Sequence, residues 1–379
     1  MKRAALAAAV AAAVAGFGSA PAAMARPAGS PATTVPAAAQ PGAAPSRGCP
    51  PDGAALSFSD ALNKQVSDGA EIGGLSSLAY DWRSRAWVSA VDNHLSDPAR
   101  IWFFRDLSDP KVTRDPLVLK MPDGTPYNGM TSDNEGLAVL PDGDYLVSSE
   151  TEPSIRIYGR DGIQLSSLPV PARFAVTGTT PLGQATSNAT LEGLTIAPSG
   201  HEIIAAMEGA LSGDVSPGGD ASLHRFLVYR QDRRGQWTLA KQVAYQAGPG
   251  MRVPEVAAYN DSSFLVEEAS FAAATGNIIQ LYAVTGLNRA PDVSSVTSLP
   301  AAPASDVMRK RLVSDVTACP TLGATSPEFQ SNPLMDNYEG MRVTPSAGHG
   351  GPAAVSLISD DNFSAGQVTR ILNLAVRLP

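Results

Sequence analysis

Short runs of alternating apolar and polar residues, each followed by turn residues, recur along most of the chain. The run at residues 135–140 leads through a Pro-Asp-Gly turn to a second β-rich run at 145–149. Residues 192–197 and 202–206 repeat this arrangement around a Pro-Ser-Gly turn. Alternation with a period of two, joined by residues that favour tight turns, is typical of β-hairpins. The chain is therefore predicted to consist largely of hairpins.

Five such runs can be aligned on one another. Their third residues are Leu78, Leu137, Leu194, Val256 and Met341. The first four are spaced by about 60 residues, which leaves room for four strands in each unit, the size of a propeller blade. No run of helical periodicity separates the units, which argues against a parallel α/β sheet. The predicted fold is all-β, a single β-propeller.

The interval before the last run is longer than the others. This length favours six blades, with one degenerate blade between about residues 285 and 335. That region is rich in Ala, Pro and Ser, so the alternative is a five-bladed ring that carries an insertion there.

The N-terminus has the pattern of a signal peptide. Lys2 and Arg3 precede an Ala/Val run at residues 4–15, and an A-x-A site follows at 23–25. A charged start, a short apolar core and a small-residue exit are typical of secretory signals. The apolar run is too short to span a bilayer comfortably, and no other stretch reaches that length. We expect residues 1–25 to be removed and the protein to be secreted or extracytoplasmic.

Residues 26–48 are mostly Pro, Ala, Gly, Ser and Thr. Such a segment buries too little apolar surface to offset its ordering entropy, so we expect a disordered linker. The folded domain is then 49–379. In an exported chain the two cysteines, Cys49 and Cys319, are expected to form a disulfide, with two buried free thiols as the alternative.

The formal net charge of −8 argues against nucleic-acid binding, because phosphate neutralisation needs clustered Lys and Arg. The partner expected instead is a small molecule, bound by a monomeric protein.

Acidic residues recur at the ends of the predicted hairpins. The residue that enters a hairpin and the residue that leaves it lie at the same end, opposite the turn. If these strands are the inner pair of each blade, their acids converge at one mouth of the propeller. The acids in question are Asp92, Glu135, Glu150, Glu192, Glu208, Glu267, Glu268, Glu339, Asp360 and Asp361.

Clustered carboxylates repel one another unless a cation, an arginine or a bound proton compensates them. Oxygen ligands from several chain segments favour Ca²⁺. The ligands expected for it are Asp92, Glu135, Glu192, Glu339 and Asp360. Four arginines near the same motifs could pair with acids or hold an anionic substrate together with Asn362; they are Arg100, Arg156, Arg252 and Arg342. The alternative is that the acids cap turns and serve the fold only.

Several of these motifs, in their order and spacing, resemble the phytase-like family, whose domain is called "esterase-like activity of phytase". The resemblance runs from about Gly73 to the C-terminus. It rests on Gly73–Leu78, Asn134–Leu137 with Ser148–Glu150, Leu191–Leu194 with Glu208-Gly209, Tyr338–Met341 and Ser359–Phe363. It implies a secreted or periplasmic propeller with hydrolase activity on phosphoesters or other esters.

The sequence departs from this family at two places. Asp92-Asn93-His94 stands where the family has an acidic pair followed by Arg, and Glu267-Glu268 stands where it has Glu-Arg. Both changes put phosphate recognition in question.

Other hydrolytic motifs are missing from the sequence. It has no G-x-S-x-G elbow, no H-E-x-x-H pair and no P-loop. An enzyme built on this chain would use carboxylates, a metal-activated water and arginine contacts. The expected catalytic residues are Glu135, Glu192, Glu339 and Asp361.

The sequence leaves three hypotheses about function. They are a Ca²⁺-dependent phosphoric-ester hydrolase, a lactonase-type or other metal-dependent ester hydrolase, and a non-enzymatic propeller that binds a ligand or a protein.

Overall fold

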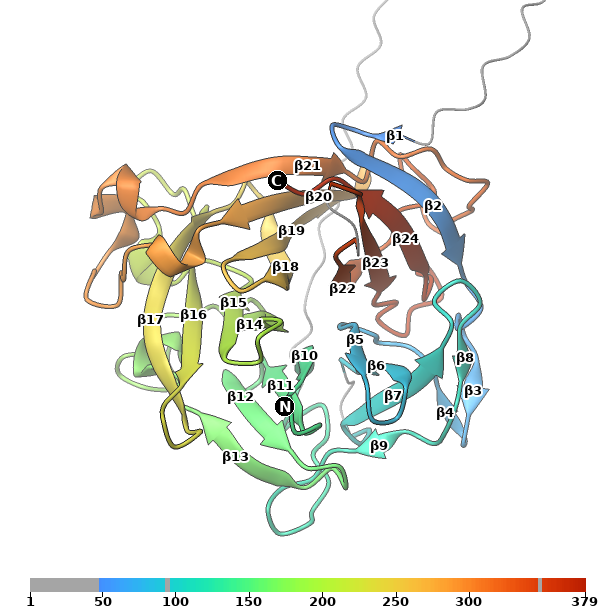
Figure 1. Cartoon of the computed structure of the whole chain (residues 1–379), viewed down its shortest axis with the longest axis horizontal. Helices are drawn as coiled ribbons and strands as arrows, with labels where there is room; N and C mark the ends of the chain where they lie inside the picture. The colour runs from blue at the N-terminus through green and yellow to red at the C-terminus, as the bar shows by residue number, and fades with distance from the viewer. Residues whose placement is uncertain (1–47, 93–95, 347–349) are drawn as a thin grey trace, which may run out of the picture. The chain divides into compact units, whose positions relative to one another are not determined.

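Antiparallel sheets stand radially around a central axis in the computed structural model of the chain (Figure 1). The structure describes residues 48–92, 96–346 and 350–379. The predicted signal peptide, the predicted linker except Gly48, and Asn93 with His94 lie outside the described residues.

The described residues form five blades, and the chain enters four of them at the strand nearest the axis. The first blade is β5 (Ala79–Asp81), β6 (Ala86–Ala90), β7 (Arg100–Arg105) and β8 (Lys111–Val112), with β9 (Leu117–Val118) also paired to β7. The second is β10 (Asn134–Val139), β11 (Tyr145–Ser149), β12 (Ser154–Tyr158) and β13 (Gln164–Leu168). The third is β14 (Leu191–Ile196), β15 (Glu202–Met207), β16 (Leu223–Gln231) and β17 (Trp237–Gln246). The fourth is β18 (Arg252–Asn260), β19 (Ser263–Ala272), β20 (Gly276–Thr285) and β21 (Lys310–Asp315).

The fifth blade joins the two ends of the folded chain. It contains β22 (Tyr338–Thr344), β23 (Ala353–Ser359) and β24 (Ile371–Val376), followed outward by β2 (Gly53–Ser59) and β1 (Gly48–Cys49). Because β2 pairs with β24, the ring is closed by backbone hydrogen bonds between segments far apart in sequence. A small hairpin of β3 (Val66–Ser67) and β4 (Ala70–Glu71) lies outside the blades. The predicted all-β propeller is confirmed.

The count of five is the alternative that the sequence left open, not the favoured six. The segment expected to hold a degenerate blade contains the long connection from β20 to β21, then β21 itself and the loop after it. The connection holds three short 3₁₀ helices at Leu287–Arg289, Leu299–Ala301 and Ala304–Asp306. It packs on the third blade, where the Val293 amide donates to the Gln242 carbonyl at 2.9 Å. Its apolar side chains cluster there instead of alternating along strands, which is why it adds no blade.

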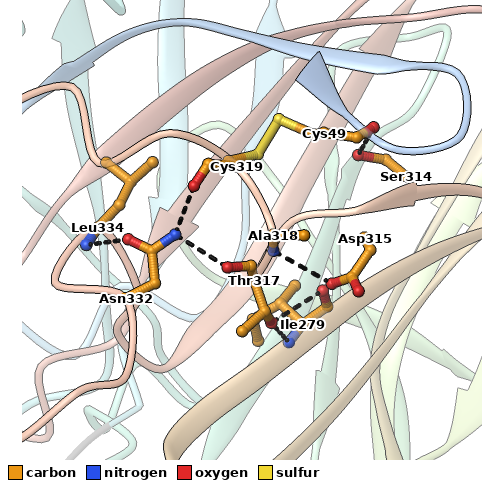
Figure 2. The surroundings of a disulfide bond; sticks show 9 residues. All are labelled: Cys49, Ile279, Ser314, Asp315, Thr317, Ala318, Cys319, Asn332 and Leu334. Carbon is orange, nitrogen blue, oxygen red and sulfur yellow. Dashed lines mark hydrogen bonds between the residues drawn. A yellow bond between two sulfur atoms is a disulfide. The ribbon is translucent and has the colours of Figure 1, made fainter. Parts of the chain in front are cut away.

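The predicted disulfide is confirmed. Cys49 and Cys319 are bonded and are separated by 270 residues, so the bond ties β1 to the loop after β21 (Figure 2). Asn332 holds this loop, since its amide donates to the carbonyls of Thr317 at 2.9 Å and Cys319 at 2.7 Å.

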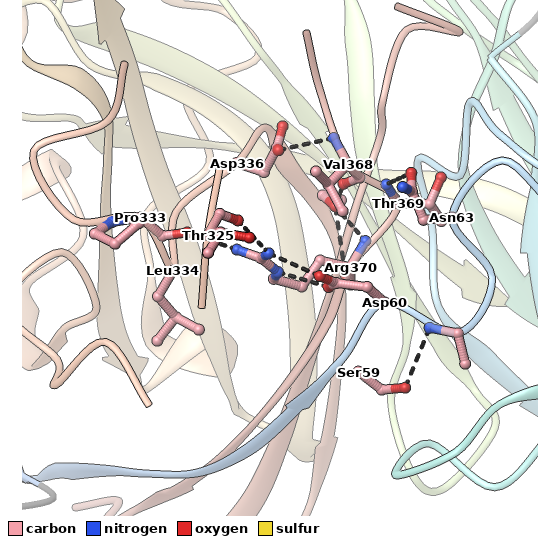
Figure 3. Close-up of polar contacts among 12 residues, drawn as sticks. Ser59, Asp60, Asn63, Thr325, Pro333, Leu334, Asp336, Val368, Thr369 and Arg370 are labelled. Carbon is pink, nitrogen blue, oxygen red and sulfur yellow. Dashed lines mark hydrogen bonds and ion pairs between the residues drawn. The ribbon is translucent and has the colours of Figure 1, made fainter. Parts of the chain in front are cut away.

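An ion pair between a buried arginine and a half-buried aspartate provides a second tie at the closure. The Arg370 guanidinium, at the start of β24, donates to both oxygens of Asp60 at 2.7 and 2.9 Å (Figure 3). It also donates to the carbonyls of Pro333 and Thr325, so each of these bonds crosses from β24 to another segment. A bidentate pair of this kind fixes position as well as adding energy.

The apolar core is divided among the spaces between neighbouring blades. One cluster joins β19 and β20 to the fifth blade, and another joins the second blade to the third. None of the helices among the described residues has the length and apolar character needed to cross a membrane.

Candidate functional site

A β-bulge interrupts the inner strand of three blades at a Glu-Gly pair. The pairing register shifts between Asn134 and Leu137, between Leu191 and Leu194, and between Tyr338 and Gly340. A bulge re-aims the side chain beside it. In each case the glutamate before the glycine lines a cavity at this end of the axis; these are Glu135, Glu192 and Glu339.

The glycine in each pair is required by the close approach of neighbouring inner strands. A Cβ on Gly136 would lie 2.5 Å from the Glu192 carbonyl oxygen, and one on Gly193 would lie 2.8 Å from the Val256 nitrogen. A Cβ on Gly340 would lie 2.5 Å from the carbonyl carbon of Ser77. The repeated motif therefore combines tight blade packing with a carboxylate directed to the axis.

The cavity has a volume of about 330 Å³, and we call it the acidic cavity. Carboxylates and amides make up its wall, with a single arginine. The lining residues are Asp92, Glu135, Glu150, Asn188, Glu192, Glu208, Arg252, Asn337, Glu339, Asp360 and Asn362. The four acids predicted to leave the first, second, third and fifth hairpins here, Asp92, Glu150, Glu208 and Asp360, are thus brought together with the three that enter.

The fourth blade breaks this pattern, which corrects the expectation for Glu267 and Glu268. Neither residue lines the acidic cavity, because Ala269 is the residue that pairs with Arg252 at this end of β19. Glu268 accepts hydrogen bonds from the Tyr245 hydroxyl at 2.5 Å and from Lys310. Glu267 is fully buried, and neither of its oxygens has a hydrogen-bond partner among the described residues.

Arg252 is the contribution of the fourth blade to the acidic cavity. Its Nη1 donates to Glu208 Oε1 at 2.9 Å, and its Nη2 lies 3.1 Å from Glu339 Oε1. Asn337 also bridges Arg252 and Glu339, because its Oδ1 accepts from Arg252 at 2.5 Å while its Nδ2 donates to Glu339 at 2.9 Å. One guanidinium therefore faces seven carboxyl groups.

Burial raises the pKa values of the acids, and the excess of negative charge adds to the shift. Burial, followed by the nearby charges of Glu192 and Asp92, raises the pKa of Glu135 well above its ordinary range. Burial and the charge of Glu150 do the same to the pKa of Glu192. Burial raises the pKa of Glu150 to about 8, although the Thr190 amide that it accepts opposes the shift. Burial and a hydrogen bond with Asp133 raise the pKa of Asp92 to about 11.

Two overlapping sets of carboxylates could hold a cation. Asp92, Asp133 and Glu135 place one oxygen each within 4.8 Å of one another, and Glu135 does the same with Glu150 and Glu192. All these donors are oxygens, the ligands of hard cations such as Ca²⁺ and Mg²⁺. The donor set fits such a cation, and its positive charge would relieve the repulsion that now raises the pKa values.

Several residues expected at the site lie elsewhere. Asp361 does not line the acidic cavity; it accepts the Gly74 amide at 2.9 Å and pairs with Lys64. Arg100 contacts Asp97 at 3.5 Å, and Arg156 donates to Ser132 at 2.8 Å. Neither arginine lines the acidic cavity.

Arg342 lines a different cavity, toward the other end of the inner strands. Of the four arginines expected near substrate, the structure brings only Arg252 to the acids, whereas Asn362 is among the residues that line the acidic cavity.

Asn188 and Asn337 were not predicted as lining residues, and Asp133 and Glu150 were not predicted as metal ligands. The sequence does hold a signal for Asn337. It lies two residues before Glu339, and Arg252 lies two residues before Pro254, the residue that aligns with Glu339 in the fourth repeat. Asn188 carries no such signal, because it lies in the connection before β14.

The fold and the site together define the class of protein, an all-β propeller with a carboxylate-lined mouth. The family model described as phytase-like, esterase-like activity of phytase, matches residues 70–363. The chain belongs to this family.

Other comparisons are more distant. No curated protein matches the chain. A gluconolactonase from Xanthomonas campestris is similar over 84% of this chain and 88% of its own, with 14% identity and a TM-score of 0.36. A PQQ-bound aldose sugar dehydrogenase from Streptomyces coelicolor is similar over 80% of each chain, with 12% identity and a TM-score of 0.36. At these TM-scores the likeness supports no inference about function.

Proposed function

We propose that the protein hydrolyses phosphoric or other ester bonds of small molecules at the acidic cavity, with a bound divalent cation, Ca²⁺ above all. The observation that carries this proposal is the convergence of seven carboxyl groups from four blades on a cavity with one arginine. Membership of a family described by esterase-like activity supports the reaction class.

The ligands proposed for the cation are Asp92, Glu135, Glu192, Glu339 and Asp360, with Asp133 and Glu150 beside them. A bound cation would polarise the ester or phosphoryl oxygen and lower the pKa of water. The acidic cavity leaves room for a small molecule beside these ligands. The glycine that follows each glutamate is instead packed against the inner strand of the next blade.

The chain itself supplies the remaining groups. Arg252 is held by Glu208 and Glu339 and is oriented to bind an anionic oxygen of substrate. Glu150 accepts a hydrogen bond from the Thr190 amide, which holds it in place as a candidate general base. Asn362 and Asn188 offer neutral donors at the wall.

We also propose that the protein works outside the cytoplasm, as a monomer. A disulfide that closes the ring supports an oxidising compartment. The signal-peptide pattern of residues 1–25 supports export.

The test begins with metal analysis and melting of the purified protein in Ca²⁺ and in chelator. We expect bound Ca²⁺ and a higher Tm in Ca²⁺. No bound metal and no shift would contradict the metal-centred proposal.

Activity is then measured on a panel of phosphomonoesters and aryl esters with Glu135→Gln and Glu339→Gln. The matched control is Glu152→Gln, because Glu152 is exposed and outside the acidic cavity. Both cavity variants should lose at least tenfold in kcat/KM, and the control should not. Activity unchanged in both would move the site elsewhere. Ca²⁺ binding without turnover on any ester would instead favour a non-enzymatic propeller whose acids bind a ligand.

A further inference from the structure

A second cavity lies toward the turn end of the inner hairpins, and we call it the apolar cavity. Its volume is about 510 Å³, and residues from all five blades line it. Leu78, Leu140, Ile196, Ala257 and Val343 are examples, one from each blade. It shares no lining residue with the acidic cavity.

Arg342 on β22 is the only charged side chain among the described residues that line the apolar cavity. Its guanidinium makes no ion pair and no hydrogen bond with any described residue, and its Nε is buried without a partner. All Asp and Glu residues of the chain lie in the described ranges, so no acid elsewhere in the sequence can supply the missing charge. Burial lowers the pKa of Arg342, and no neighbouring charge opposes this shift.

Two fully buried arginines behave differently. Arg225 pairs with Asp214 at 2.6 Å, and Arg370 pairs with Asp60 at 2.7 Å. Arg342 is half-buried, and its Nε is fully buried. A partly buried charge without a partner costs stability, and an apolar residue of similar length would remove that cost. Arg342 therefore has the character of a group kept for binding and not for stability.

Two aromatic side chains among the lining residues are unusually exposed. Trp82 is 51% exposed and Tyr80 is 40% exposed. Both come from the first blade, at the turn end of its inner hairpin. Large exposed aromatic residues beside an apolar cavity are typical of a site that covers an apolar ligand.

We propose that the apolar cavity binds a small amphiphilic carboxylic acid. Its carboxylate pairs with Arg342, and its hydrocarbon or aromatic body lies against the apolar walls and the two exposed aromatic side chains. A carboxylate fits better than a phosphate monoester, because one guanidinium neutralises one negative charge and a dianion would leave a buried charge. Planar guanidinium and carboxylate groups also match in a bidentate pair. This site is separate from the proposed ester hydrolysis.

The test is calorimetric titration of the purified protein with octanoate and, separately, with octan-1-ol. Tryptophan fluorescence serves as a second readout, since Trp82 lines the apolar cavity. We expect saturable binding of octanoate to one site, at least tenfold tighter than that of octan-1-ol. Equal binding of the two would overturn the proposal, because it would reflect apolar contact alone. Absence of octanoate binding would also overturn it.

Arg342→Met, Arg342→Lys and the exposed control Arg234→Met, at a residue outside the apolar cavity, locate the site. Arg342→Met should weaken octanoate binding at least tenfold and raise the Tm, Arg342→Lys should bind at an intermediate level, and the control should match the wild type. Unchanged octanoate binding in Arg342→Met, or a lower Tm, would contradict the assignment. The comparison of octanoate with octan-1-ol on the wild type needs no variant, so it decides the question even if a variant does not fold.

Discussion

Arg252 Nη2 lies 3.1 Å from Glu339 Oε1, which joins the inner strand of the fourth blade to that of the fifth. The fourth blade has no acid at the two positions where the second, third and fifth blades place theirs; it supplies this arginine instead. The arginine compensates part of the charge around the acidic cavity. The remaining carboxyl groups hold protons or share a cation, and this competition underlies two of the following predictions.

Arg252→Met removes the only guanidinium from the acidic cavity. We expect the free energy of unfolding in chelator to fall by about 3 kcal/mol, because Glu208 and Glu339 lose their partner while they stay buried. Urea denaturation measures the change, with the exposed Arg234→Met as control. Ca²⁺ should restore part of the loss; the same loss with and without Ca²⁺ would argue that the cation binds elsewhere.

In chelator the free energy of unfolding should fall as pH rises, whereas a salt-bridged acid would make it rise. The folded protein keeps a proton on Glu150 up to about pH 8, whereas the unfolded chain releases it near pH 4.3. The folded state thus binds more protons than the unfolded state in this window, so the free energy of unfolding falls as pH rises from about 5 to 8.

Denaturation curves at several pH values measure this slope. Glu150→Gln should reduce it, and Ca²⁺ should reduce it further, since a cation replaces the protons. Stability that rises with pH across this window in chelator would refute the expectation.

Gly136→Ala tests the close contact between inner strands. The added Cβ would lie 2.4 Å from the Leu194 Cβ, so we expect a loss of about 2 kcal/mol. The matched control is Gly218→Ala, where the nearest neighbour of a new Cβ, the Ser216 Oγ, is 3.8 Å away. Chemical denaturation of the two variants should separate them clearly, and equal stability would mean that the blades can move apart at no cost.

Removal of the disulfide with Cys49→Ser and Cys319→Ser should lower the free energy of unfolding by about 4 kcal/mol, because the bond restricts a long loop in the unfolded chain. Denaturation of the double variant is compared with that of the oxidised and reduced wild type. The reduced wild type should match the double variant. A variant as stable as the oxidised protein would show that the pairing of β2 with β24 closes the ring by itself.

Much of the fold and part of the site could be predicted from local patterns. Alternation and turn residues identified the hairpins, and the ends of the hairpins placed Glu135, Glu192 and Glu339 at one mouth. Those inferences held because strand direction and side-chain alternation are local properties of the chain.

Other features depended on contacts between distant segments. The blade count turned on whether residues 285–335 form a blade of their own or, as found, pack on the third blade and add one outer strand to the fourth, which is a tertiary choice. The shift of Glu267 away from the acidic cavity depended on pairing register, where a change of one residue moves a side chain to the other face.

The sequence by itself determined the repeated hairpins, the cysteine pair and the acidic character of one end of the propeller. Only the tertiary structure decided that Arg252 compensates those acids while Arg342 faces an apolar cavity without a partner. Arg252 precedes one copy of the repeated motif and Arg342 follows another. Their roles differ because charge partners are set by which blades meet, not by spacing along the chain.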